Sequence, residues 1–151
     1  MNKGPEKPLT VKKVVLWQNE VEDKPGILAN ALEPLANAGA KLQVVIGYRY
    51  PSDPGKTAIE LYPVTSMKSV AAAKATRLTA SSIAILLVEG DDRPGLGCAV
   101  ARAIANAKID FGFLVAQVIG KKCSATVGFE TEAGARKAAA VIKQASAGKK
   151  K

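Results

Sequence analysis

Two short turns in this sequence carry the residues best placed to do chemistry. Residues 23–26 read Asp-Lys-Pro-Gly and residues 92–95 read Asp-Arg-Pro-Gly, and an apolar helical pattern follows each turn. Proline suits the first turn of a helix, where its missing N–H would be unpaired anyway, and aspartate can cap the free N–H groups there. Glycine lets the backbone approach another group closely or relieves a tight entry into the helix. Each turn is therefore a candidate either for ligand contact or for helix capping alone.

The residue inventory argues against an enzyme. The chain has no histidine and no plausible nucleophile–base pair, so little general acid–base chemistry is available. Residues 93–97 are glycine-rich but lack the spacing of a dinucleotide-binding loop. Cys98 and Cys123 lie in different predicted elements, so we expect no disulfide framework, no metal site and no cofactor. Cys98 is predicted to be a small buried packing residue.

The two turns belong to an internal repeat. Their prolines stand 69 positions apart, and the same offset relates residues 36–38 to 105–107 and Thr57 to Thr126 without a gap. A repeat that keeps its register over this length is a structural unit, which predicts two units of about 70 residues each. Units of this size bury a limited core alone, so we expect them to pack together.

Hydrophobic periodicity predicts the order β-α-β-β-α in both repeats. In repeat 1 the predicted elements are a strand from Val14, a helix ending at Gly39, strands over 42–50 and 57–62, and a helix over 66–76 capped by Ser66. In repeat 2 they are a strand over 83–88, a helix after Gly95, strands over 109–119 and 124–130, and a helix over 132–145.

Lysines near the two chain ends supply most of the net charge of +9. We therefore predict a basic N-terminal extension at 1–13 and a basic C-terminal tail at 146–151, flanking repeat 1 at 14–80 and repeat 2 at 81–145. Basic tails on a nearly neutral body are typical of solvated chain ends. No apolar run approaches the roughly 20 residues of a membrane span, and residues 1–13 lack the apolar core of a signal peptide. We expect a cytoplasmic protein without membrane contact.

The β-α-β-β-α order and the acidic-x-Pro-Gly turn after the first strand resemble the ACT domain, a small regulatory module of amino-acid metabolism. The resemblance rests on residues 23–28 with 37–39 and on residues 92–96 with 106–107, and it spans nearly the whole chain. It implies a free-standing tandem ACT protein of α+β class, with two ferredoxin-like βαββα(β) units. Each unit would have an antiparallel sheet with helices on one face.

One feature departs from the ACT pattern, in which a fourth strand ends each unit. Residues 76–82 leave room only for a very short strand, and none follows Ala145. The first strand of repeat 2 would then be a sheet edge, which proteins usually cover. Three partners remain open for it: the extended segment 8–13, the other repeat, or a second chain.

The resemblance implies that an amino acid or similar small effector binds where two modules meet. N–H groups at the helix starts can hold a carboxylate, and acidic side chains or backbone carbonyls can hold an ammonium group. Leu28, Leu96, Val45 and Leu114 would line the side-chain pocket, and Leu28, opposite Gly97, makes one pocket narrower. The predicted ligand-binding residues are Glu20, Asp23, Lys24, Pro25, Gly26, Ile27, Leu28, Asp91, Asp92, Arg93, Pro94, Gly95 and Leu96.

Two functions are compatible with these features of the sequence. In the first, the protein is a regulatory sensor, expected as a homodimer, whose effector shifts the conformation of a regulated protein partner. In the second, it is a protein–protein interaction module with non-functional effector sites. Nucleic-acid binding is disfavoured, because sheets that bind RNA need exposed stacking aromatics, and Phe111 and Phe113 read as core.

Overall fold

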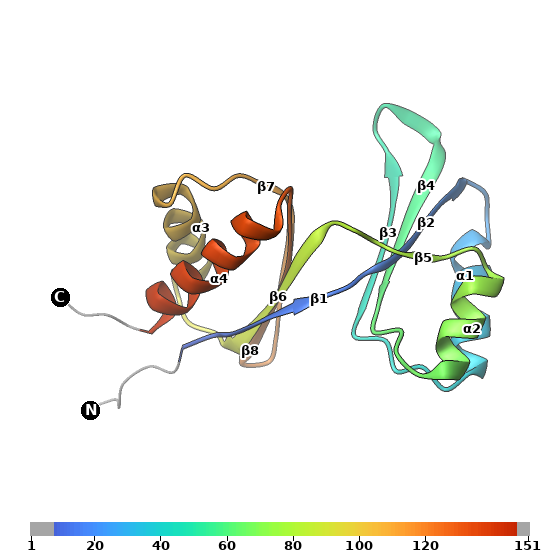
Figure 1. Ribbon diagram of the computed structural model, residues 1–151, viewed down its shortest axis with the longest axis horizontal. Coiled ribbons are helices and arrows are strands. Elements are labelled where there is room, and N and C mark those ends of the chain that lie inside the picture. The colour runs from blue at the N-terminus through green and yellow to red at the C-terminus, as the bar shows by residue number, and fades with distance from the viewer. Residues whose placement is uncertain (1–7, 148–151) are drawn as a thin grey trace. The chain divides into compact units, whose positions relative to one another are not determined.

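The computed structural model describes residues 8–147, which form two compact units (Figure 1). The first unit is Val15–Ser82. The second unit joins the chain from Ile83 onward to the N-terminal segment that ends at Val14. No helix in this described part of the chain has both the length and the apolar character that a membrane span requires.

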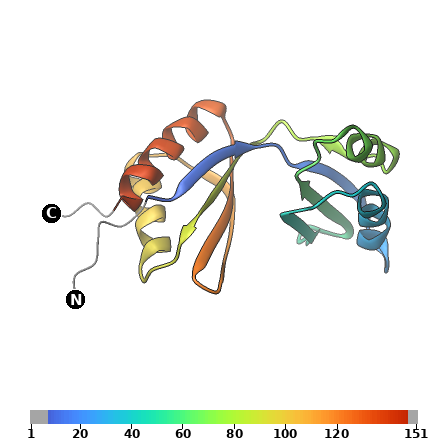
Figure 2. The same ribbon diagram turned by 90° about the horizontal axis from the view of Figure 1, so that it is seen from below.

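The first unit contains a four-stranded antiparallel sheet and two helices. Its elements are β2 (Trp17–Glu22), α1 (Ile27–Asn37), β3 (Val44–Tyr50), β4 (Asp53–Tyr62), α2 (Met67–Ala75) and β5 (Thr79–Ala80). The strand order is β3-β4-β2-β5, and both helices lie on the same face of the sheet (Figure 2). Alternate residues of β4, such as Ile59 and Leu61, point to that face and are buried with Leu35 of α1 and Ala73 of α2.

The second unit repeats this architecture with one strand from elsewhere in the chain. Its elements are β1 (Thr10–Val14), β6 (Ala84–Asp91), α3 (Leu96–Asn106), β7 (Phe111–Ile119), β8 (Lys122–Phe129) and α4 (Glu132–Ser146). The strand order is β1-β6-β8-β7, all antiparallel. Leu86 and Val88 of β6 and Val127 of β8 are buried with Ile104 of α3 and Ile142 of α4.

The predicted fold class is therefore confirmed. Both units show the order β-α-β-β-α, an antiparallel sheet and helices on one face. Ser66 caps α2 as predicted, since its hydroxyl accepts a hydrogen bond from the Ser69 N–H at 3.0 Å. Pro34 lies inside α1 without ending the helix.

Strand β1 covers the edge that the sequence leaves open in the second unit. Of the three partners considered, the N-terminal segment is the one that pairs with β6, in a register from Thr10 opposite Glu89 to Val14 opposite Ile85. Residues 10–13 of the predicted N-terminal extension are thus part of a sheet. In the first unit, the two-residue strand β5 occupies the same place beside β2.

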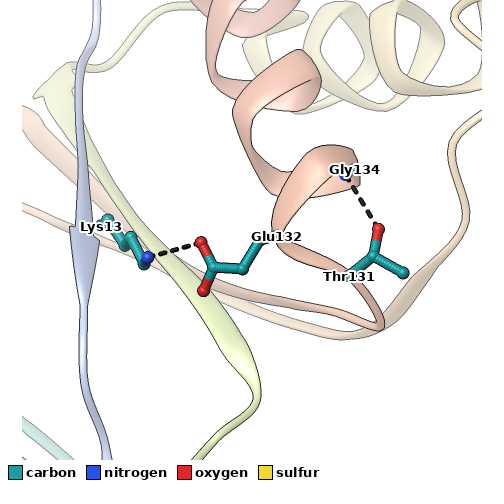
Figure 3. Close-up of polar contacts among 4 residues, drawn as sticks. All are labelled: Lys13, Thr131, Glu132 and Gly134. Atoms are coloured by element: carbon teal, nitrogen blue, oxygen red, sulfur yellow. Dashed lines mark hydrogen bonds and ion pairs between the residues drawn. The ribbon is translucent and has the colours of Figure 1, made fainter.

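Three contacts hold the N-terminal segment in the second unit. Leu9 is 4% exposed, and its N–H donates to the Ser146 hydroxyl at 2.8 Å. Gly90 lets Leu9 lie close to β6, because a Cβ at that position would come within 2.7 Å of Leu9 Cδ2. Lys13 of β1 forms an ion pair with Glu132 at the start of α4, at 2.5 Å (Figure 3).

The repeat keeps its offset through β7 and then loses three residues. Arg49 of β3 corresponds to Val118 of β7, 69 positions later, but Arg49 pairs with Thr57 whereas Val118 pairs with Cys123, 66 positions later. The β7–β8 turn is therefore three residues shorter than the β3–β4 turn. Thr57 corresponds in space to Cys123, and the predicted match of Thr57 to Thr126 is wrong.

Candidate functional site

The helices that follow the two acidic turns begin differently from the other two helices. Ser66 and Thr131 cap α2 and α4 through their side chains (the Thr131 cap is drawn in Figure 3). The residues before α1 and α3 are instead Gly26 and Gly95, with φ of 86° and 81°, and no side chain caps either helix. Such φ values are left-handed and favour glycine, so the glycines serve the entry into the helix.

Uncapped starts leave backbone donors available. In α3, the Leu96 N–H donates to a turn carbonyl at 3.2 Å, and the Ala99 N–H donates to Gly95 at 2.9 Å. The N–H groups of residues 97 and 98, which lie between Leu96 and Ala99, have no acceptor within residues 8–147. The start of α1 repeats this pattern and leaves the N–H groups of residues 28 and 29 free in the same sense. Donors of this kind attract anions such as a carboxylate.

A pocket of about 220 Å³ opens beside the start of α3. Its walls are mostly apolar, and all the residues that line it belong to the second unit. The lining residues are Leu9, Val88, Asp92, Leu96, Gly97, Val100, Leu114, Ala116, Gln117, Val118, Cys123, Ser124, Ala125 and Val127. The free donors of the helix start therefore stand next to a mostly apolar cavity.

The corresponding space beside α1 is filled by a side chain. Leu28 stands where α3 has Gly97, and Gly47 stands where β7 has Ala116. Leu28 packs over the strand at this point, because a Cβ on Gly47 would lie 3.7 Å from Leu28 Cδ2. Leu28 thus occupies a place beside the strand that Gly97, which has no side chain, leaves open in the second unit.

The two turn aspartates are also in different situations. Asp23 accepts a hydrogen bond from the Thr57 hydroxyl at 2.8 Å and pairs with Arg49 at 3.1 Å, so it does not cap α1 as predicted. At the positions of Arg49 and Thr57 the second unit has Val118 and Cys123. Among the described residues, no hydrogen bond or ion pair engages the Asp92 carboxylate, which lines the pocket. Asp92 can therefore pair with a ligand cation.

The two cysteines of the second unit differ in accessibility. Burial raises the pKa of the Cys123 thiol, and the nearby Asp92 carboxylate raises it further. Cys123 is therefore a neutral, weakly polar part of the pocket wall. Cys98 is exposed, and the prediction that it is a buried packing residue is wrong, because it lies on the solvent side of the first turn of α3.

The other predicted site residues lie around the turns without joining one cluster. Glu20 lies 3.7 Å from Lys56, and Asp91 forms an ion pair with Lys122. Arg93 donates to the Ser146 carbonyl at 3.3 Å, away from the lining of the pocket. Ile27 lines a separate hollow of the first unit, and its N–H donates a hydrogen bond to the Lys24 carbonyl. Pro25 and Pro94 directly precede Gly26 and Gly95.

Sequence reasoning missed the strand residues that complete the pocket. It named Leu114 of β7 but neither Ala116 nor Val118, and it named no residue of β8. The available signal was the small residue Ala116, two positions after Leu114 on the same strand face. The described residues contain no cluster of side chains able to hold a metal ion.

Comparison with known proteins identifies relatives in fold. No protein-family model matches the sequence, and no curated protein sequence matches it. Protein BT0572 from Bacteroides thetaiotaomicron is similar in structure, with a TM-score of 0.69 at 14% identity over 90% of this chain and 89% of that chain. The alpha and beta subunits of aspartokinase give 0.64 at 15% identity over 93% and 97%. The ligand-free regulatory subunit of aspartate kinase from Thermus thermophilus gives 0.61 at 14% identity over 93% and 98%.

The different exposure of the cysteines predicts their order of alkylation. Iodoacetamide at about pH 7 should modify Cys98 first, because the thiolate is the nucleophile and the raised pKa keeps Cys123 protonated. Peptide mass spectrometry of a time course measures both rates. In the Cys98→Ser variant, the rate at Cys123 should rise steeply between about pH 7 and about pH 9. Faster labelling of Cys123 than of Cys98 at neutral pH would contradict the described pocket wall.

Proposed function

We propose that this chain is a tandem ACT-domain regulatory protein that binds an amino acid effector and has no catalytic activity of its own. The observation that carries the proposal is the start of α3. There, free N–H donors, the Asp92 carboxylate and an apolar pocket meet in one place. The similarity in fold to the regulatory subunit of aspartate kinase supports a regulatory role.

The proposed binding mode uses each part of the site for one group of the effector. The effector carboxylate accepts hydrogen bonds from the N–H groups of residues 97 and 98, helped by the positive end of the helix dipole. Its ammonium group pairs with Asp92. Its side chain lies against Leu114, Val118 and the other apolar walls, which favours an apolar side chain because a charged one would lose its hydration there.

The proposal assigns the site to the second unit alone. In the first unit Leu28 occupies the space and Arg49 neutralises Asp23, so that turn serves the structure. The effector then acts by binding one conformation more tightly than another, and a regulated protein partner, in the cytoplasm, responds to the difference.

We further propose a homodimer formed through β7. This nine-residue strand is the edge of its sheet, and its exposed side chains include Leu114, Val115, Val118 and Ile119. A long apolar edge is a template for pairing with another strand. Because β7 also forms one wall of the pocket, a second copy on this edge would shield the effector from water.

Filling the pocket should abolish effector binding. Gly97 has a free space around the position of a Cβ, and leucine is a better helix former than glycine by up to about 1 kcal/mol, so Gly97→Leu should fold at least as stably as the wild type. Isothermal titration calorimetry with the common amino acids should give binding in the wild type and none in Gly97→Leu. The exposed neighbour variant Cys98→Leu is the matched control and should bind normally. No heat with any amino acid in the wild type would instead favour an interaction module with non-functional sites.

The two aspartates should respond oppositely to neutralisation. Asp92→Asn should weaken binding of the amino acid found by calorimetry by about tenfold or more, because it removes a charged partner of the ammonium group. Asp23→Asn should leave that affinity within about twofold and lower the free energy of unfolding by up to about 1 kcal/mol, because Asp23 pairs with Arg49. Equal loss of affinity in both variants would contradict the assignment to one unit.

A charge on the β7 edge should separate the proposed dimer. Val115 is 51% exposed and does not line the pocket, so Val115→Lys places like charges near each other only if two β7 edges meet. Size-exclusion chromatography with light scattering should give a dimer for the wild type and a monomer for Val115→Lys. Ala101→Lys, on the exposed face of α3, adds the same charge away from the edge and should remain dimeric. A monomeric wild type would overturn this part of the proposal.

A further inference from the structure

The first unit has a polar cavity on the face of its sheet opposite the helices. Ala58 and Glu60 line it, and they alternate along β4 with Ile59 and Leu61, which are buried under the helices. The cavity measures about 230 Å³. Its polar lining residues include Gln18, Glu20, Tyr50, Glu60, Arg77 and Thr79. The effector pocket proposed above belongs to the other unit, so the two cavities are distinct.

One residue that lines this cavity, Glu60, carries a buried carboxylate. Glu60 is 7% exposed, and its Oε2 accepts a hydrogen bond from the Tyr48 hydroxyl at 3.2 Å. Among the described residues, no Lys or Arg forms an ion pair with Glu60. Burial raises the pKa of Glu60, and the hydrogen bond from Tyr48 only partly opposes this. A carboxylate in such surroundings costs folding free energy that a neutral residue would not.

The repeat shows that the fold does not require this charge. In the sheet, Glu60 lies opposite Gln18 of β2 and Ile46 of β3. The residue in the same place of the second unit is Thr126, which lies opposite Leu87 of β6 and Val115 of β7. Thr126 is equally buried, at 5% exposure, and is neutral. The same position of the same scaffold is therefore filled without a carboxylate in one unit and with one in the other. A charge that the architecture does not need points to a role in binding.

The surroundings of Glu60 suit a cationic group. Tyr48 and Tyr50 stand edge to face with their ring centres 5.8 Å apart, and aromatic rings attract cations at short range. The Glu20 carboxylate lies at the same cavity and raises the pKa of Tyr50 to about 12. An ammonium group has three donors and no acceptor, so it fits a site of carboxylate and hydroxyl oxygens.

We propose that this cavity is a second ligand site, which binds a small molecule through a primary ammonium group held by Glu60 and Glu20. Two sources of that group fit the lining. A simple amine would use the acidic residues alone, whereas an amino acid would also place its carboxylate near Arg77. Both kinds of ligand bind through the ammonium group, and the experiment below distinguishes a simple amine from an amino acid.

The test is a titration of the full chain followed by backbone amide NMR. The probes are 1,4-diaminobutane, L-ornithine (the same amine with a carboxylate) and butanoate (an anion without an amine). Both amines should shift the amide signals of Gln18, Ala58 and Thr79, and butanoate should not. Glu60→Gln should weaken both amines by at least about tenfold, because a charged hydrogen-bond partner is lost. Arg77→Gln should weaken only L-ornithine if the carboxylate contributes.

Stability measurements separate a binding role from a structural one. Without ligand, Glu60→Gln should unfold at the same temperature as the wild type or higher, because it removes a buried charge. Should this variant fail to fold, Glu60→Thr introduces the residue of the second unit and carries the same binding test. Gly97→Leu should leave this site unchanged, so the result does not depend on the effector pocket.

Three outcomes would overturn the proposal. They are equal amine affinity in the wild type and Glu60→Gln, no amine-induced shifts at millimolar probe concentration, and binding of butanoate in place of the amines.

Discussion

The structure of the second unit depends on the pairing of its first strand, β6, with a segment from the opposite end of the sequence. An uncovered β6 would present a row of unpaired backbone groups, and β1 satisfies them. The same segment brings Leu9 against Gly90 and Ser146 and into the wall of the pocket. The N-terminal segment that completes the sheet therefore also lines the candidate site, through Leu9.

The starts of α1 and α3 are two copies of one structure, but the side chains around them differ. Both start at a left-handed glycine and leave the same two N–H groups without an acceptor among the described residues. Leu28 fills one copy, and Gly97 leaves the other open. The sheets diverge in the same way, since Glu60 replaces the neutral Thr126. The two candidate sites thus lie in different units, with the effector pocket beside α3 in the second unit and the Glu60 cavity on the sheet of the first.

Local sequence signals were sufficient for the architecture. The acidic-Pro-Gly turns, the periodicity of residues such as Leu35 and Ile104, and the 69-residue offset predicted two βαββα units, and these are present. Such signals are short-range, so they report on elements and on their order along the chain. The same signals singled out Asp92 and Leu96, which lie beside the turn that starts the helix and line the pocket there.

Long-range pairing was decided only by the tertiary structure. Strand register decides which of the three partners covers β6. It also decides the three-residue shortening of the β7–β8 turn and the consequent match of Thr57 to Cys123. Register in turn decides that Asp23 meets Arg49 while Asp92 faces an open pocket. The sequence by itself determined the elements and the position of the helix starts, because these follow from neighbouring residues. Tertiary structure decided which start remains open, because that follows from side chains brought together across the sheet.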